Sequence, residues 1–204
     1  MRKARGGVRL MAIDLIEEQL RVLPVSIATI LQSDGVGDEA VAASAHLMLK
    51  RKSRPHKTGS AGNIVADYVP PDTQLDLQAS VQTMRQHPEL RADYLRVVVS
   101  NALLSIGMFL RQHDMAEMRT PEVQFLGHVV NAILNANTFR VETGYIPIAA
   151  FDGLVVTSAL NGTPLFGNQN TDGFMEFGDA IALLQWLSRY LRGESEFISW
   201  GDAG

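Results

Sequence analysis

The sequence feature that most constrains the fold is an apolar stripe with helical spacing in the middle of the chain. Its members recur every three or four positions: Leu95, Val98, Val99, Ala102, Leu103, Ile106, Phe109 and Leu110. Because an α-helix has about 3.6 residues per turn, this spacing puts all of them on one face. Arg96 and Arg111 fall on other faces of the same helical wheel. We therefore expect a helix over 90–112 that forms the centre of the core.

A second core helix is expected over 121–136, directly after a strong start signal. Thr120, Pro121 and Glu122 supply a capping hydroxyl, a proline suited to the first helical position and an acid near the positive end of the helix dipole. The apolar stripe of this helix consists of Val123, Leu126, Val130, Ile133 and Leu134. His128 lies beside this stripe, and we expect it to be a core or interface histidine rather than a catalyst.

Further helices are predicted on both sides of this pair, and a change of composition marks where they give way to other structure. The predicted segments are 11–23, a kinked continuation from Pro24 to Leu31, 39–52, 73–86 and 177–192. Residues 53–63 are basic and then rich in small residues, which is typical of an exposed, mobile loop. After Thr138 the chain is rich in β-branched residues and glycine, and Asn161-Gly162 between apolar flanks predicts a hairpin near 153–166.

These segments predict a mainly α fold, an irregular bundle of about six or seven helices with a small β-hairpin in the C-terminal third. The first ten residues, MRKARGGVRL, differ from the rest of the chain, because Met11 opens a natural helix start. We expect 1–10 to be a disordered basic arm and 11–137 to be the helical core. We expect 138–204 to hold the hairpin and loops and a C-terminal helix packed on the same domain.

Composition limits the classes of function. The chain has 204 residues, of which 46% are hydrophobic and 20% are charged, and this is ordinary usage for a globular protein. Its net charge of -4 gives no general attraction to nucleic acid or to an anionic membrane. The absence of cysteine excludes disulfides, thiolate catalysis and cysteine-ligated zinc, and it fits a cytoplasmic location. No stretch reaches the roughly 20 apolar residues of a bilayer span, so we expect no membrane insertion.

A polar stretch near the C-terminus, NQNTDGFMEFGD, offers oxygen ligands at every second position. The candidate metal ligands are Asn168, Asn170, Asp172, the carbonyl of Phe174, Glu176 and Asp179. With Gly173 in the sixth position and a helix directly after it, the stretch resembles the calcium loop of the EF-hand family. The resemblance implies weak calcium binding, because Asn168 is neutral and Asp179 is shorter than the usual glutamate. The alternative is a polar turn in which Asp179 caps the last helix. No other cofactor is expected.

Basic residues gather at the start of the predicted loop. This basic patch consists of Lys50, Arg51, Lys52, Arg54 and Lys57. Arg51 and His56 have the R-x-x-x-x-H spacing of helical ribonucleases of the HEPN class, and the resemblance implies that they act on an RNA phosphodiester. Pro55 lies between them and interrupts the helical turn that would align them. The patch also suits phosphate, an acidic partner or plain solvation. It holds no aromatic side chain on which bases would stack, so nucleic acid is the weaker expectation.

No catalytic motif stands out in the sequence, which contains no GxSxG, GxGxxG or P-loop pattern. The tail carries Phe197, Ile198 and Trp200, which either dock on the domain or form an interface with a partner. We therefore predict a non-catalytic helical assembly or adaptor module that self-associates or binds a protein partner. The alternatives are an RNA-directed helical nuclease that uses Arg51 and His56, and a weak calcium-binding module at 168–179.

Overall fold

The computed structural model describes residues 2–35, 46–49, 54–57, 64–68, 73–115, 120–142, 147–168 and 170–194. The chain divides into two compact units, which we call the helical unit (Met1–Ile30 and Glu89–Gly204) and the ribbon unit (Leu31–Pro88). The predicted mainly α class is confirmed, and five α-helices lie in the described residues. They are fewer than the predicted six or seven for two reasons: two predicted segments run on as one helix, and another is a strand over its described part.

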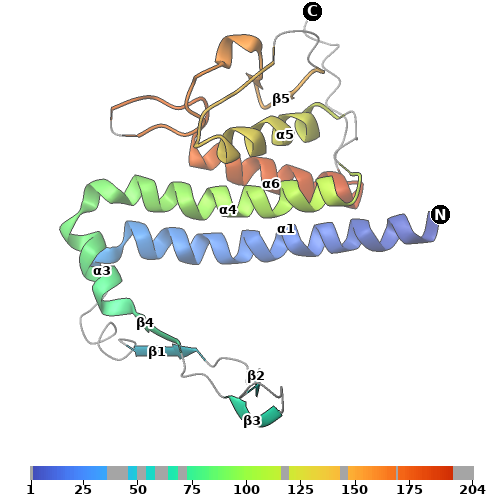
Figure 1. Cartoon of the computed structure of the whole chain (residues 1–204). Helices are drawn as coiled ribbons and strands as arrows, with labels where there is room; N and C mark the ends of the chain where they lie inside the picture. Colours follow the sequence, from blue (N-terminus) through green and yellow to red (C-terminus); the bar gives the residue numbers. More distant parts are fainter. Residues whose placement is uncertain are drawn as a thin grey trace, which may run out of the picture. The chain divides into compact units, whose positions relative to one another are not determined.

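The core of the helical unit is built from α4 (Arg91–Gln112), α5 (Pro121–Leu134) and α6 (Phe177–Arg192), which pack on one another (Figure 1). The apolar stripe of α4 is buried as predicted, with its least exposed members at Val99, Ala102, Leu103, Ile106 and Leu110. Fully burying a valine, leucine or isoleucine side chain stabilises the fold by about 1.5–3 kcal/mol. The two central helices predicted from the sequence are therefore the centre of this core.

α4 and α5 meet at Gly107 and Val130. A Cβ atom built on Gly107 would lie 2.3 Å from Cγ2 of Val130. One turn further along α4, the Arg111 guanidinium donates hydrogen bonds to the carbonyl of Gly127 (2.9 Å) and to Oδ1 of Asn131 (2.7 Å). The lack of a side chain at Gly107 allows the close approach, and the hydrogen bonds of Arg111 hold the two helices together where they cross.

α1 (Arg2–Leu31) differs from the predicted N-terminal region in two ways. The helix begins at Arg2, whereas the sequence predicts a disordered arm over 1–10. It also continues through Pro24 as one helix. The inner face of α1 is buried in the core through Ala12, Ile13, Ile16 and Leu23. In addition, Nε of Arg9 donates to the carbonyl of Leu191 in the last turn of α6. This packing orders the arm and offsets the roughly 3 kcal/mol that a proline costs inside a helix.

A small antiparallel hairpin does lie in the C-terminal third. β5 (Ala150–Phe151) pairs with β6 (Leu154–Val155), and Asp152 and Gly153 between them have φ values of 45° and 85°. Two positive φ values are typical of a type I′ turn, which matches the twist of paired strands. At the predicted site, Asn161 has φ -57° and ψ 122° and Gly162 has φ 84°. These values define a type II turn, which here comes after η3 (Ser158–Leu160) instead of joining two strands.

Asn137 ties the loops of the C-terminal third to the helices. It lies just after α5 in the left-handed region, with φ 64°. Its Nδ2 donates to the carbonyl of Phe166 (2.9 Å), and its Oδ1 accepts a hydrogen bond from the Phe166 amide (3.1 Å). One amide side chain therefore satisfies both backbone groups of a residue that is itself buried.

The ribbon unit contains two antiparallel ladders. β1 (His46–Leu49) pairs with β4 (Thr73–Asp76), and β2 (Arg54–Lys57) pairs with β3 (Ile64–Tyr68). Both ladders have the same register, apart from a shift after His56. α3 (Leu77–Gln86) follows β4 directly.

The strands correct three predictions. The helix predicted over 39–52 is wrong for 46–49, the loop predicted over 53–63 is wrong for 54–57, and the helix predicted over 73–86 begins only at Leu77. The physical reason is that strand pairing is non-local. Leucine and methionine in HLML favour a helix by themselves, and only their partners far along the chain select a strand. The helical core predicted over 11–137 is therefore interrupted.

The segment Pro88–Gln112, which includes α4, is long and apolar enough to cross a membrane when only length and composition are considered. The core helix of a soluble protein meets the same criterion. One face of α4 is buried among the other helices of the helical unit. Only 33% of the apolar window is buried, so the core accounts for part of the apolarity of this segment.

Candidate functional site

α1 carries a second apolar face on the side away from the core. This outer stripe consists of Met11, Leu15, Glu18, Val22 and Val25, which are spaced by 4, 3, 4 and 3 residues. The exposed fractions are 56% for Met11, 59% for Val22 and 68% for Val25. Leu15 is half-buried and Glu18 is exposed. Since the inner face of α1 is already buried, this helix presents more apolar surface than its own core uses.

The outer stripe is not among the sequence-based predictions, although its signal is present in the sequence. Because Glu17 and Glu18 are adjacent, the sequence suggests a single polar face of the helix opposite Ile13 and Ile16. In the structure these two acids diverge. Glu17 turns to α6, and only Glu18 lies in the outer stripe. A second repeat with heptad spacing, read separately from the first, would have identified this face.

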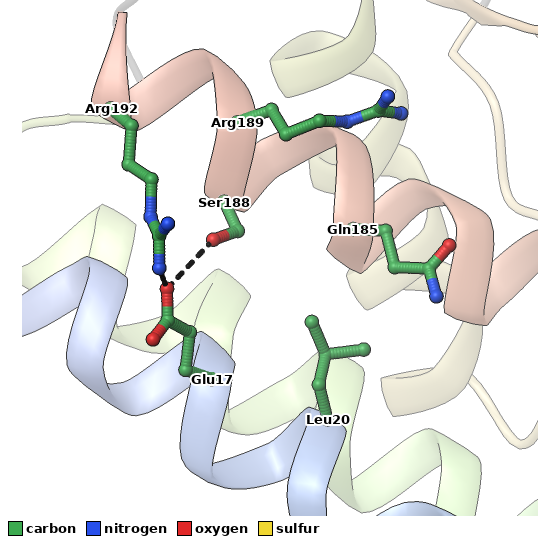
Figure 2. Close-up of a pocket in the computed structure, with 6 residues that line it drawn as sticks. All are labelled: Glu17, Leu20, Gln185, Ser188, Arg189 and Arg192. Atoms are coloured by element: carbon green, nitrogen blue, oxygen red, sulfur yellow. Dashed lines mark hydrogen bonds and ion pairs between the residues drawn. The ribbon is translucent and has the colours of Figure 1, made fainter. Parts of the chain in front are cut away.

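A groove with a volume of about 420 Å³ lies between α1 and α6 (Figure 2). Its lining consists of Glu17, Leu20, Gln185, Ser188, Arg189 and Arg192. Glu17 Oε1 forms an ion pair with Arg192 and accepts a hydrogen bond from Ser188 Oγ at 3.3 Å. In Figure 2, Arg189 extends along α6 and away from Glu17.

The chemistry of this groove favours a structural role. Ser188 would need a free base to become a nucleophile, and the carboxylate that it contacts is paired with Arg192. A carboxylate held by a cation is a weaker base than a free one. The contacts of Glu17 with Ser188 and Arg192 therefore fasten α1 to α6, as the contact of Arg9 does nearer the N-terminus of α1.

The polar stretch at 168–179 forms a turn and a helix start. Oδ1 of Asn168 accepts hydrogen bonds from the amides of Asn170 (2.8 Å) and Thr171 (3.0 Å) and from the Thr171 hydroxyl (2.9 Å). Asp179 Oδ2 accepts the amide hydrogen of Glu176 at 2.8 Å, and the two residues form a capping box at the start of α6. The side-chain oxygens predicted at the two ends of the calcium loop therefore serve the chain's own hydrogen bonds.

The remaining predicted metal ligands are only partly brought together. Asn168, Asp172 and Glu176 line a pocket of about 300 Å³. Asn170 is exposed, and α6 begins at Phe177, so Asp179 lies inside the first helical turn. Among the described residues, no group of three or more His, Asp or Glu side chains has the geometry to hold a metal ion. Calcium binding through Phe174 and the other predicted ligands stays a prediction.

The basic patch falls largely outside the described residues. Lys50, Arg51 and Lys52 are not among them, whereas Arg54, His56 and Lys57 belong to β2. The Arg51–His56 pair thus stays a prediction, but its second member is in a strand instead of a helix. The tail residues Phe197, Ile198 and Trp200 also lie outside the described part of the chain.

His128 provides a pH-dependent test of the core around α5. Burial, and then the nearby Arg111 guanidinium, lower the pKa of His128 from its usual value of about 6.5. The unfolded chain therefore takes up this proton at a higher pH than the folded chain does, so the free energy of unfolding should fall as the pH decreases through about 6.5. Urea unfolding of the wild type and of His128→Gln checks this: the variant should lose part of the pH dependence. Equal slopes for the two proteins would contradict it.

The sequence matches no protein-family model, and searches of curated proteins and of solved structures found no match either. The outer stripe, the groove between α1 and α6 and the polar loop are therefore the surfaces from which a function has to be inferred.

Proposed function

We propose that the chain is a non-catalytic helical assembly module that associates through protein surfaces, with itself or with a protein partner. The observation that supports this proposal is the outer stripe of α1. Three of its apolar side chains are more than half exposed and lie in one line along one helix. An exposed apolar row on one helix face, here interrupted by Glu18, supports an interaction site, because leaving apolar surface in water is unfavourable.

Other exposed apolar side chains are fewer on each face. Leu10 and Leu31 lie off the stripe on α1, and Val97 and Met108 share one face of α4 as a single pair. Leu134 ends α5, and Ile148 and Val155 flank the small hairpin. Single exposed apolar residues are normal on protein surfaces and need no partner. The outer stripe differs from them by its repeat, which is the pattern by which helices pair.

The stripe is also held firmly in place. Arg9 binds the carbonyl of Leu191, and Glu17 binds Arg192 and Ser188, so two positions along α1 are fastened to α6. A surface that is already ordered loses little conformational entropy when a partner docks. α1 is therefore suited to act as a preformed docking helix.

Sedimentation velocity of the full chain tests the proposal. We expect the weight-average mass to rise from that of one chain towards that of two as the concentration increases through the micromolar range. Because the surface is mainly apolar, added salt should not dissociate the complex, unlike one held by ion pairs. A single-chain mass at every concentration, up to high micromolar, would overturn self-association.

A further inference from the structure

The charges beside the outer stripe indicate how two such helices would be oriented relative to each other. Asp14 and Arg21 each directly precede an apolar member of the stripe, and they lie seven residues apart. Seven residues are two helical turns, so both side chains flank the stripe on the same side. Asp14 is exposed, and 74% of the Arg21 side chain is exposed, although it also lies 3.5 Å from Glu17. One flank of the stripe thus presents an acid and a base, two turns apart.

Resting on the proposed function, we propose that the outer stripe docks against the outer stripe of a second copy, with the two α1 helices antiparallel. In an antiparallel pair, the equivalent flanking positions of the two helices face each other across the seam. Asp14 of each copy then faces Arg21 of the other, and the two-fold axis produces this ion pair twice. The same register places Met11 opposite Val22 and Val8 opposite Val25.

In a parallel pair, Asp14 and Arg21 would not face opposite charges. In such a pair, a residue on one flank of the stripe faces the residue five positions later, on the opposite flank of the other helix. Asp14 would therefore face Gln19, and Arg21 would face Ser26. Neither contact joins opposite charges. Gln19 and Ser26 are moreover half-buried, on the flank that turns towards the core. The charge pattern and the open flank both favour the antiparallel arrangement.

The two kinds of residue contribute differently to the pairing. Exposed ion pairs add little affinity, so Asp14 and Arg21 set orientation, while Met11, Val22 and Val25 supply the apolar contact. Glu18 interrupts the stripe and lies opposite Leu15 in this register. A single polar residue in a helical seam lowers affinity and selects one register, which keeps the pairing specific and reversible.

Thiol cross-linking tests the register directly, because the chain has no cysteine of its own. Met11→Cys and Val22→Cys are made singly and together in the full chain and treated with a short bifunctional thiol reagent. Each single variant should stay uncross-linked, because its two thiols lie about 16 Å apart along the seam. The double variant, and a mixture of the two single variants, should give covalent dimers. A dimer from Met11→Cys alone would overturn the antiparallel arrangement.

Affinity measurements separate this inference from the proposed function. Val25→Glu should weaken the dimer at least about tenfold. Val97→Glu is the matched control, because Val97 is also more than half exposed (55%) but lies on α4, and it should leave the dissociation constant unchanged. Asp14→Arg should also weaken the dimer, and Arg21→Asp in the same chain should restore it. A dimer that survives Val25→Glu overturns this docking mode alone, whereas a monomeric wild type overturns self-association as well.

Discussion

Replacing Gly173 with alanine is expected to lower the free energy of unfolding by about 3 kcal/mol or more, at the top of the range for an overpacked site. The added Cβ would lie 2.1 Å from the amide nitrogen of Gly167 and 2.5 Å from the carbonyl carbon of Phe166. Both are backbone atoms, so no side-chain rotation relieves the contact. Gly173 is not in the left-handed region, which means that space rather than conformation requires a glycine here.

The surrounding hydrogen bonds prevent an easy backbone shift. The amides of Phe174 and Met175 donate to the carbonyls of Pro164 (2.9 Å) and Leu165 (3.0 Å), directly beside the close approach. Moving residue 173 away would break these bonds. It would also disturb the next residue along, Phe166, both of whose backbone groups are held by Asn137.

Urea unfolding monitored by circular dichroism measures this effect, with Gly178→Ala as the matched control. A Cβ on Gly178 meets no atom within 4 Å, and the residue lies in the first turn of α6. That substitution should change the free energy of unfolding by less than about 0.5 kcal/mol or stabilise the protein slightly. If the two variants were equally stable, the close approach of residues 166–167 to residue 173 would be contradicted.

The same glycine also occupies the sixth position of the EF-hand resemblance, so a loss of stability alone does not distinguish packing from metal binding. The two explanations differ in their dependence on calcium. If packing is the cause, excess chelator leaves the wild type unchanged, and the full difference between wild type and Gly173→Ala remains. A difference that requires calcium would instead support a metal-binding loop at 168–179.

The helical part of the fold was predictable because its signals are local. The stripe of α4 and the proline in the first turn of α5 are visible within a window of a few turns. The same holds for the end of α6, where Gly193 has φ 79° as a helix C-cap glycine requires. Within such a window, spacing and capping residues determine the element without help from the rest of the chain. The predicted capping role of the Thr120 hydroxyl is wrong, because its side chain makes no cap hydrogen bond and the hydroxyl lies 2.8 Å from that of Tyr190.

The missed features depend on residues far apart in the sequence. Nothing near HLML shows that residues 73–76 will pair with it, and nothing near Asn137 shows that its side chain will bind the backbone of Phe166. The candidate surface on α1 is a different case. Its repeat is local, but the adjacent Glu17 and Glu18 suggest one polar face in the sequence. In the structure Glu17 contacts α6, and only Glu18 lies on the outer face.

Gly107 is a further long-range constraint, and replacing it with alanine is expected to lower the free energy of unfolding by about 2 kcal/mol. Alanine in mid-helix is favoured over glycine by about 1 kcal/mol. That gain is outweighed, because the new Cβ would lie 2.3 Å from Cγ2 of Val130. Val130 is fully buried and β-branched, so it has essentially one χ1 rotamer in a helix and cannot swing away.

A neighbouring glycine provides the control for this prediction. Gly127 lies in the interior of α5, and a Cβ there meets no atom within 4 Å. Gly127→Ala should therefore show the helix propensity alone and raise the free energy of unfolding by about 0.5–1 kcal/mol. Two glycine-to-alanine changes on two packed helices should thus have opposite signs, which a general effect of added methyl groups does not produce.

A double-mutant cycle with Val130→Ala identifies the contact itself. Val130→Ala alone should cost about 2 kcal/mol, because it leaves a cavity between α4 and α5. It also removes Cγ2, the atom that the new Cβ of Gly107→Ala would meet. In that background Gly107→Ala should cost almost nothing or even stabilise, giving a coupling energy of about 2 kcal/mol between the two positions. If the two losses simply add, α4 and α5 do not cross at these residues.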